Sequence, residues 1–225
     1  MRRPAPSRRL RHLIRHRSGV AAVEFALTAP LILTIFLGGA ELTNFAITRM
    51  RVSQIALHVA DNASRIGANS LLTAPQISEV QINDLFLGAN LQAGALDLKT
   101  RGRVIVSSFE AVASPNTTQK FIIRWQRCYG DKAWLSSYGK AGTTKLDDIG
   151  PDGQKVTAPD DTAVIFVEVA YDYKPLIAGR FVGNTLIRDI AAMTVRDQRD
   201  YEGPDGKGIY NEEGVTPSSC VNPAP

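Results

Sequence analysis

The longest apolar stretch of the chain lies close to its start. Between Arg17 and Glu41 the sequence reads SGVAAVEFALTAPLILTIFLGGA, 23 residues with a single charge, at Glu24. A helix rises about 1.5 Å per residue, so this stretch would be about 35 Å long, enough to cross a hydrocarbon layer of roughly 30 Å. We therefore predict a transmembrane segment over residues 20–41.

The same helix is predicted to continue beyond the membrane over residues 42–70. Apolar positions recur there at steps of three and four, with Arg49 as the one interruption; they are Leu42, Phe45, Val52, Ile55, Val59, Ala63 and Ile66. Gly67 and Asn69 indicate where this helix ends. Pro30 removes one backbone hydrogen bond, so we expect a bend there. The stripe favours packing on the chain's own exported domain, with packing on neighbouring subunits as the alternative.

The second half of the chain carries strand patterns. A short helix is predicted within Gln76–Leu91, and Ser114-Pro115-Asn116 suits a hairpin turn. Stretches rich in β-branched and aromatic residues predict four strands, at Gly102–Ala113, Gln119–Cys128, Thr162–Tyr173 and Ile187–Arg196. We therefore expect an α+β fold, a long N-terminal transmembrane helix followed by a small antiparallel β-sheet domain. This domain would occupy residues 71–200, before an irregular tail rich in Gly and Pro at 201–225.

Charge is concentrated in a leader over residues 1–19. Seven arginines and no acidic residue precede Gly19, so of the formal charge of +4 the rest of the chain carries about −3. A phosphate-binding surface for nucleic acid is therefore not expected on the folded part. Arginines before the span and Glu41 after it predict a cytoplasmic N-terminus and an exported C-terminal domain. A cleaved secretory signal and a buried core helix are the alternatives; the length of the run and the adjacent arginines argue against them.

Glu24 is the most informative single residue. A carboxylate at membrane depth costs about 2.5–3.5 kcal/mol, so it usually has a partner or a function. The alternative without a special function is that Glu24 lies at the edge of the span and its carboxylate reaches the lipid headgroups. Cleavage after Gly19 would create an ammonium group on Val20, and Glu24 of a neighbouring copy could neutralise it inside the lipid. Such pairing would set the axial register between packed helices.

The residues around Glu24 also carry a family resemblance. Arg17–Phe25 resembles a class III prepilin cleavage site, and GVAAVEFALTAPLIL is similar to the N-terminal signature of TadE/TadG-like pseudopilins of the Tad (tight adherence, Flp pilus) system. Pro30 fits that pattern too. A weaker similarity to the closing strands of that family lies at Val167–Leu176 and Ile187–Arg196.

The resemblance implies a minor pilin-like structural subunit rather than an enzyme. Processing by a prepilin peptidase would involve Gly19 and Val20, and assembly would involve Glu24, Phe25 and Pro30. Its partners would be other pilins or pseudopilins, the peptidase, and the assembly platform and motor. It would be a single-pass protein of the inner membrane, with its C-terminal domain periplasmic or extracellular. No cofactor, metal, nucleic acid or small-molecule substrate is expected.

Cys128 and Cys220 are the only cysteines of the chain. On the exported side of a membrane two thiols commonly pair, and this bridge would close a loop of about 93 residues. Such a loop corresponds to about 4–5 kcal/mol of stabilisation through the unfolded state. Two free cysteines or a catalytic thiol are the alternatives.

Other chemistry-bearing residues point to no recognised centre. His12 and His16 lie in the leader and His58 lies on the long helix, so no exported histidine cluster exists for zinc or for a Ser-His-Asp arrangement. Loop carboxylates such as Asp147 and Asp160 lack calcium-loop spacing. The aromatic residues Trp125, Tyr129, Trp134 and Tyr138 favour core packing over a surface patch. A tethered envelope domain that binds a ligand is the main alternative function; a secreted enzyme that uses the loop carboxylates is another.

Overall fold

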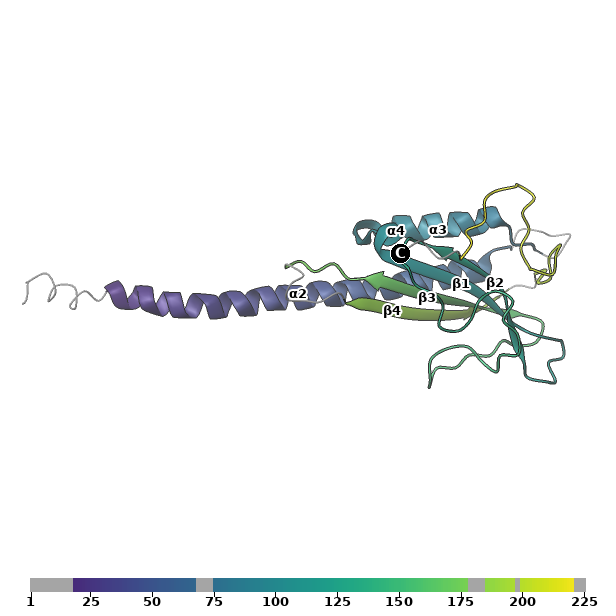
Figure 1. The fold of residues 1–225 in the computed structure, drawn as a ribbon, viewed down its shortest axis with the longest axis horizontal. Helices are drawn as coiled ribbons and strands as arrows, with labels where there is room; N and C mark the ends of the chain where they lie inside the picture. Colours follow the sequence, from purple (N-terminus) through teal and green to yellow (C-terminus); the bar gives the residue numbers. More distant parts are fainter. Residues whose placement is uncertain (1–17, 68–74, 178–184, 197–198, 221–225) are drawn as a thin grey trace, which may run out of the picture.

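A computed structural model describes residues 18–67, 75–177, 185–196 and 199–220. Residues 1–17 of the arginine-rich leader lie outside these ranges. Helix α2 (Ser18–Arg65) is one continuous element of 48 residues, and Figure 1 shows its first half protruding from a domain that packs around its second half. The long helix predicted from the sequence is confirmed. It ends at Arg65, and Gly67 follows with φ of 96°, a left-handed conformation that suits glycine after a helix.

The four predicted strands form one antiparallel sheet. They are β1 (Gly102–Ala111), β2 (Phe121–Tyr129), β3 (Ala163–Asp172) and β4 (Leu186–Thr194), in the order β2-β1-β3-β4. A register shift between Ser108 and Phe109 interrupts the β1–β2 pair, whereas β3 and β4 pair without irregularity. The predicted α+β layout of a long helix followed by an antiparallel sheet is confirmed, with strand ends displaced by one or two residues.

A second helix, α3 (Glu79–Ala93), covers the same face of the sheet as α2. It begins with a capping box, in which the Ser78 hydroxyl accepts from the backbone N–H of Gln81 and the Gln81 side chain accepts from the N–H of Ser78. This confirms the short helix predicted there. A 3-10 turn, η1 (Gly94–Leu96), and the one-turn helix α4 (Leu98–Arg101) lead into β1.

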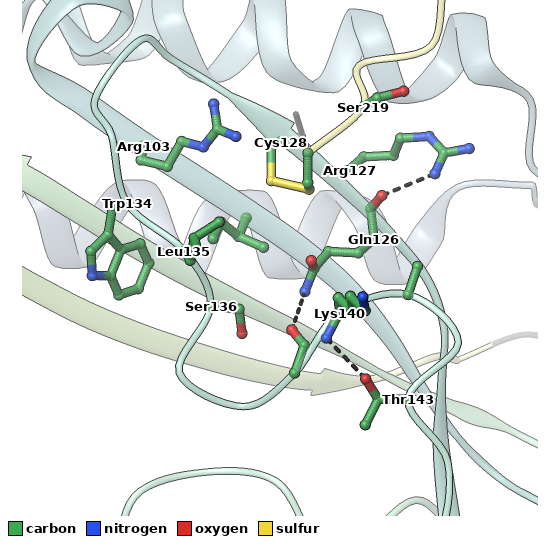
Figure 2. A pocket seen from close by; sticks show the side chains of 14 residues that line it. Arg103, Gln126, Arg127, Cys128, Trp134, Leu135, Ser136, Lys140, Thr143 and Ser219 are labelled. Atoms are coloured by element: carbon green, nitrogen blue, oxygen red, sulfur yellow. Dashed lines mark hydrogen bonds between the residues drawn. A yellow bond between two sulfur atoms is a disulfide. The ribbon is translucent and has the colours of Figure 1, made fainter. Parts of the chain in front are cut away.

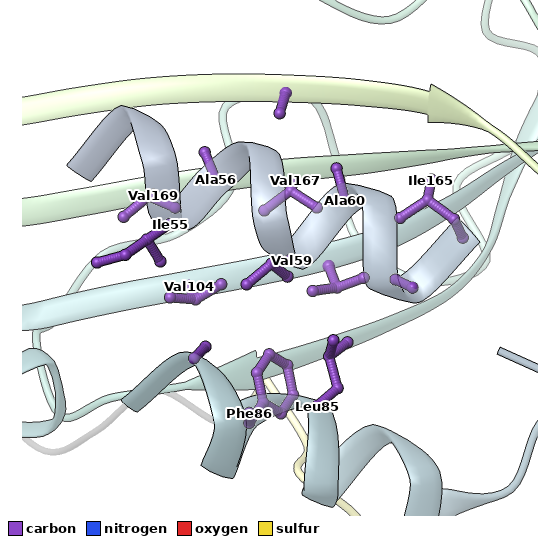
Figure 3. Packing of buried hydrophobic residues seen from close by; sticks show 14 of the residues in the cluster. Ile55, Ala56, Val59, Ala60, Leu85, Phe86, Val104, Ile165, Val167 and Val169 are labelled. Carbon is purple, nitrogen blue, oxygen red and sulfur yellow. The ribbon is translucent and has the colours of Figure 1, made fainter. Parts of the chain in front are cut away.

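The main core lies between these helices and the sheet. Val52, Ile55 and Val59 of α2 share this core with Val167 and Val169 of β3. Figure 3 shows Ile55 and Val59 between the helix and the sheet. The helix therefore packs on its own domain, as the apolar stripe predicts. The stripe is wrong at its beginning, because Leu42 is 69% exposed while Glu41 and Thr48 are buried. At the end of the stripe that is nearest the apolar run, the helix therefore presents the polar Glu41, and not Leu42, to the domain.

The opposite face of the sheet is covered by irregular chain. Phe109, Ile123 and Phe166 form a smaller core there with Ile149 and Ala158 of the connection between β2 and β3. The aromatic residues singled out in the sequence divide between the two cores; Trp125 is buried in the main core, Tyr129 stacks on Phe86, Tyr138 meets Phe166 edge to face, and Trp134 is half-buried. They do not form one surface patch.

Covalent and hydrogen-bond contacts hold the last described segment to the domain. Cys128 of β2 and Cys220 are joined by a disulfide, the pair named from the sequence, and the backbone N–H of Cys128 donates to the Ser218 carbonyl at 2.8 Å. The guanidinium of Arg199 donates to the Ala63 carbonyl at 3.3 Å and to that of Ile66 at 3.1 Å. Arg199 thus satisfies carbonyls at the C-terminal end of α2, where a cation is favoured.

Candidate functional site

The first half of α2 is an apolar helix surface that no other described part of the chain covers. Val20, Phe25 and Phe36 have exposed fractions of 58%, 72% and 72%. So much contiguous exposed apolar surface requires either lipid or other apolar helices around it. By length and composition α2 can cross a membrane, and it is the one such helix among the described residues.

The predicted processing site lies at the start of this helix. Gly19 is exposed, and a Cβ built on it meets no atom within 4 Å. The peptide bond that joins Gly19 to Val20 is therefore not covered by the folded domain, which packs on α2 tens of residues later. A membrane-embedded peptidase would meet no steric obstacle from the described part of this chain.

The predicted assembly residues follow within three turns. Glu24 and Phe25 are exposed, and in the described ranges no cation forms an ion pair with Glu24. Pro30 lies inside α2 without interrupting it, and the hydroxyl of Thr34 donates to the Pro30 carbonyl at 2.7 Å. The bend expected at Pro30 stays a prediction. The arrangement leaves the Glu24 carboxylate exposed on a helix that is long enough to cross a membrane.

A second carboxylate marks where α2 meets the folded domain. Glu41 is 8% exposed and accepts hydrogen bonds from the Tyr173 hydroxyl at 2.6 Å and from the backbone N–H groups of Leu176 and Ile177 at 2.9 and 3.0 Å. The Asn44 amide donates to the same hydroxyl at 2.7 Å. Glu41 was predicted only as a flanking charge; in the structure it fastens the end of the span to the chain that follows β3.

Sequence reasoning missed this junction for a simple reason. Glu41 and Tyr173 are 132 residues apart, and neither belongs to a motif that specifies a partner. The local signal that was available is weaker: a carboxylate at the end of an apolar run, immediately before a stripe of buried positions, is expensive to bury without donors. That signal predicts a partner but does not identify it.

A cleft of about 730 Å³ lies on the outer face of the sheet, beneath the connection after β2 (Figure 2). Arg103, Trp134 and Lys140 line it together with the disulfide. Gln126 is held in place because its amide donates to the Ser107 hydroxyl at 2.9 Å and to the Gly139 carbonyl at 3.2 Å. Burial lowers the pKa of Arg103, and the nearby Asp131 charge opposes that effect. The lining therefore combines cations, one amide and an aromatic ring.

One cation of the cleft lining already has a carboxylate partner. The guanidinium of Arg127, at the rim of the cleft, donates to the carboxylate of Glu79. Its Nε lies 3.1 and 3.0 Å from the two carboxylate oxygens. Among the described residues no group of three or more His, Cys, Asp or Glu side chains could hold a metal ion.

Comparison with known proteins finds a match for one segment near the start of the chain. Residues 19–69 match the model of the TadE-like protein family. No curated protein and no solved structure matches the chain. The match begins at Gly19 and ends just after the C-terminus of α2, so it covers the exposed half of the helix, the Glu41 junction and the core-packing half. The weaker similarity at Val167–Leu176 lies outside it and stays a prediction. Residues 19–69 are thus a TadE-like segment, which confirms for this part of the chain the resemblance to the Tad pilus family predicted from the sequence.

Proposed function

We propose that the protein is a minor pilin-like structural subunit, a pseudopilin, of a Tad-type pilus or secretion machine. The observation that carries the proposal is the order of three features along α2: the TadE-like segment begins at Gly19, the helix is uncovered from that residue to Ala40, and contact with the folded domain begins at Glu41. A helix that extends alone over lipid length and then carries a rigid domain is suited to bundling with other such helices.

Maturation would proceed by prepilin peptidase cleavage after Gly19. The basic leader would remain on the cytoplasmic face of the inner membrane, and the domain from Glu41 onward would lie in the periplasm or outside the cell. Cleavage would free the ammonium group of Val20 at the end of an apolar helix. A glycine before the scissile bond supports this proposal because it places no side chain in the path of the peptidase.

Assembly would then pair unlike charges within the bilayer. An unpaired Glu24 carboxylate and an unpaired Val20 ammonium are each expensive in lipid, whereas together they are tolerable. If the ammonium of one subunit meets Glu24 of the next, the two helices are offset by about four residues, or about 6 Å. Phe25 and Pro30 would shape the helix surface that packs at this offset. The role is structural, without catalysis, and other pilins, the platform and the motor would be the partners.

The decisive experiment is the mass of the mature chain isolated from membranes. The proposal predicts a chain that begins at Val20. In cells that express the peptidase, Gly19→Ala should retain the leader, whereas Ala21→Gly, a matched change beyond the scissile bond, should be processed. Normal maturation of the Gly19→Ala chain would overturn the proposed processing site.

A second candidate function is a membrane-tethered envelope domain that binds a ligand, and the outer-face cleft favours it. Its cations, the Gln126 amide and the Trp134 ring would form a recognition surface, and its volume is in the ordinary range for a ligand site. This function predicts an intact leader and an unassembled chain. The mass measurement therefore separates the two candidates directly.

A further inference from the structure

The two edge strands of the sheet differ in how far the rest of the chain covers them. Edge strand β2 is covered along its outward side: Phe121 exchanges backbone hydrogen bonds with Leu146, Ile123 exchanges them with the segment 142–143, and Cys128 donates to Ser218. The last of these contacts is fixed by the Cys128–Cys220 disulfide. An edge covered in this way cannot accept another strand without losing those bonds.

Edge strand β4 has no such cover in the described ranges. Thr185 and Val195 flank it. The Thr185 carbonyl accepts from the N–H of Tyr173, the residue after β3, at 3.0 Å, and the Val195 N–H donates to the Ala163 carbonyl of β3 at 2.9 Å. Since the β3–β4 register is unbroken, the odd-numbered residues bond to β3. The outward backbone groups therefore belong to Leu186, Arg188, Ile190, Ala192 and Thr194.

One of these outward groups has a cap from its own strand. The Asp189 carboxylate accepts from the N–H of Ile190 at 2.8 Å. A charged side chain on an edge is a common guard against unselective pairing. The distal half of the strand, Ala192 and Thr194, has no such cap among the described contacts, and the partly buried Ile190 and Ala192 pack against the smaller core. An added strand would extend that core.

Strand direction limits what can be added. Tyr173 after β3 lies beside Glu41 at the membrane-proximal end of the domain, and Arg199 after β4 lies beside Ala63 at the distal end. Hence β4 runs away from the membrane, and an antiparallel partner must run toward it. In a second copy anchored in the same membrane, β2 is the edge strand with that direction, and its outward side is covered.

We propose that the outer edge of β4 is a strand-addition site for an extended segment of a different polypeptide, not for a second copy of this chain. The segment runs toward the membrane, bonds to the outward groups from Thr194 to Arg188, and carries apolar side chains opposite Ile190 and Ala192. Main-chain hydrogen bonds provide affinity and the alternate side chains provide selection. This site extends the proposed function by assigning the exported domain a partner, and it depends on a shared membrane anchor rather than on cleavage after Gly19.

Proline substitution tests the site. Ala192→Pro removes an outward N–H without removing a bond to β3, and Ala192→Thr keeps that N–H; Ala191→Pro breaks the β3–β4 ladder and serves as the misfolded reference. The full-length chains would be expressed in the native cells with a photo-crosslinking amino acid at Thr194, or at exposed Leu135 as the position control. Folding would be followed by the Cys128–Cys220 disulfide and by resistance to protease.

The expected result is a cross-link from Thr194 to one other polypeptide that persists in Ala192→Thr, falls at least tenfold in folded Ala192→Pro, and is absent at Leu135. Absence of a cross-link from Thr194 in the wild-type chain, a cross-link to a second copy, or an unchanged cross-link in Ala192→Pro would each overturn the proposal. If Ala192→Pro does not fold, Thr194→Pro with the label at Arg188 replaces it. The N-terminal mass, measured on the same chains, reports on the proposed function separately.

Discussion

The hydroxyl of Tyr173 donates a hydrogen bond of 2.6 Å to the carboxylate of Glu41 and thereby joins the end of the predicted span to the chain that follows β3. Phe45, one turn further along α2, meets the Tyr173 ring edge to face with centroids 5.1 Å apart. The contact fixes the direction in which the domain sits on its helix. In a filament of packed helices, that direction determines which surfaces of neighbouring domains meet.

Tyr173→Phe should therefore loosen the junction while leaving the aromatic contact in place. We expect a lower urea midpoint for the full chain in detergent micelles, followed by Trp fluorescence, because a buried carboxylate loses its side-chain donor. Tyr129→Phe is the matched control, since its ring stacks on Phe86 and its hydroxyl has no hydrogen-bond partner in the ranges that the structure describes. In a double-mutant cycle with Glu41→Gln, purely additive effects would contradict the coupling.

Glu24→Ala should separate membrane insertion from assembly. The substitution removes a charge that is unfavourable in lipid, so we expect insertion and processing to be retained and pilus assembly to be lost. Glu24→Asp keeps the charge and should assemble in part. Thr28→Val changes one polar residue a single turn later and should assemble normally. Recovery of the subunit from sheared pili provides the measurement, and normal pili from Glu24→Ala chains would remove the register role of the carboxylate.

Local patterns predicted the elements of this fold and not the contacts between distant parts. The stripe from Val52 to Ala63 has a period set by helix geometry alone, so it could be read without the rest of the chain. The burial of Glu41 depends on a tyrosine 132 residues away. Leu42 illustrates the same limit: its apolarity and spacing fit the stripe, but the domain reaches α2 from the side on which Glu41 and Thr48 lie.

The outer face was the least predictable part. The segment between β2 and β3 has few period-2 or helical signals. Its Ile149 and Ala158 join the smaller core of Phe109, Ile123 and Phe166, and it makes isolated backbone contacts such as those of Leu146 with Phe121. Gly142 and Gly150 adopt positive φ values of 83° and 123° within it, which a sequence reader sees only as turn residues. The cleft beside Trp134 is a product of this irregular packing, so the sequence predicted neither its location nor its lining.

Glu168 provides a test of burial energetics in this domain. It is 1% exposed, and one of its carboxylate oxygens has no hydrogen-bond partner among the described residues. Burial raises the pKa of Glu168 above its usual value, partly opposed by hydrogen bonds from Ser136 and the Ser137 backbone. The folded chain therefore binds more protons than the unfolded chain just above the ordinary carboxyl pKa, and the free energy of unfolding falls as pH rises through that window.

Glu168→Gln should raise the free energy of unfolding at pH 7 by on the order of 1 kcal/mol, because no buried charge remains without a full set of donors. The same substitution should flatten the decline of stability between pH 4 and 7, measured by urea titration at a series of pH values. Burial also raises the pKa of Glu110, but Arg124 and Ser108 bond to that carboxylate and it is unchanged in the variant. Equal pH slopes in the two chains would show that Glu168 does not titrate in this window.

The disulfide should be a large contributor to stability. Its cysteines are 92 residues apart, and closing a loop of that length corresponds to about 4–5 kcal/mol in the chain-entropy model. The Cys128→Ser, Cys220→Ser double variant should unfold at a much lower urea concentration than the oxidised chain, while the reduced wild type should resemble the variant. A midpoint within experimental error of the oxidised wild type would mean that the tail is held by its other contacts, such as those of Ser218 and Thr216 with Asn83.

Release of the tail should also change how copies of the chain meet. Without the disulfide, the Ser218 carbonyl is no longer held next to the N–H of Cys128. That end of β2 can then pair with β4 of another copy anchored in the same membrane, because the two strands run in opposite directions. In micelles at high protein concentration, the double serine variant should therefore form oligomers that a chemical cross-linker captures. The oxidised wild type should not form them. Addition of Ala192→Pro should abolish them, because it removes an outward N–H of β4, whereas Ala192→Thr should not. Oligomers that persist in the presence of Ala192→Pro would indicate general unfolding rather than pairing of β2 with β4. A double serine variant that stays monomeric at every concentration would show that Leu146 and Thr143 suffice to cover the β2 edge.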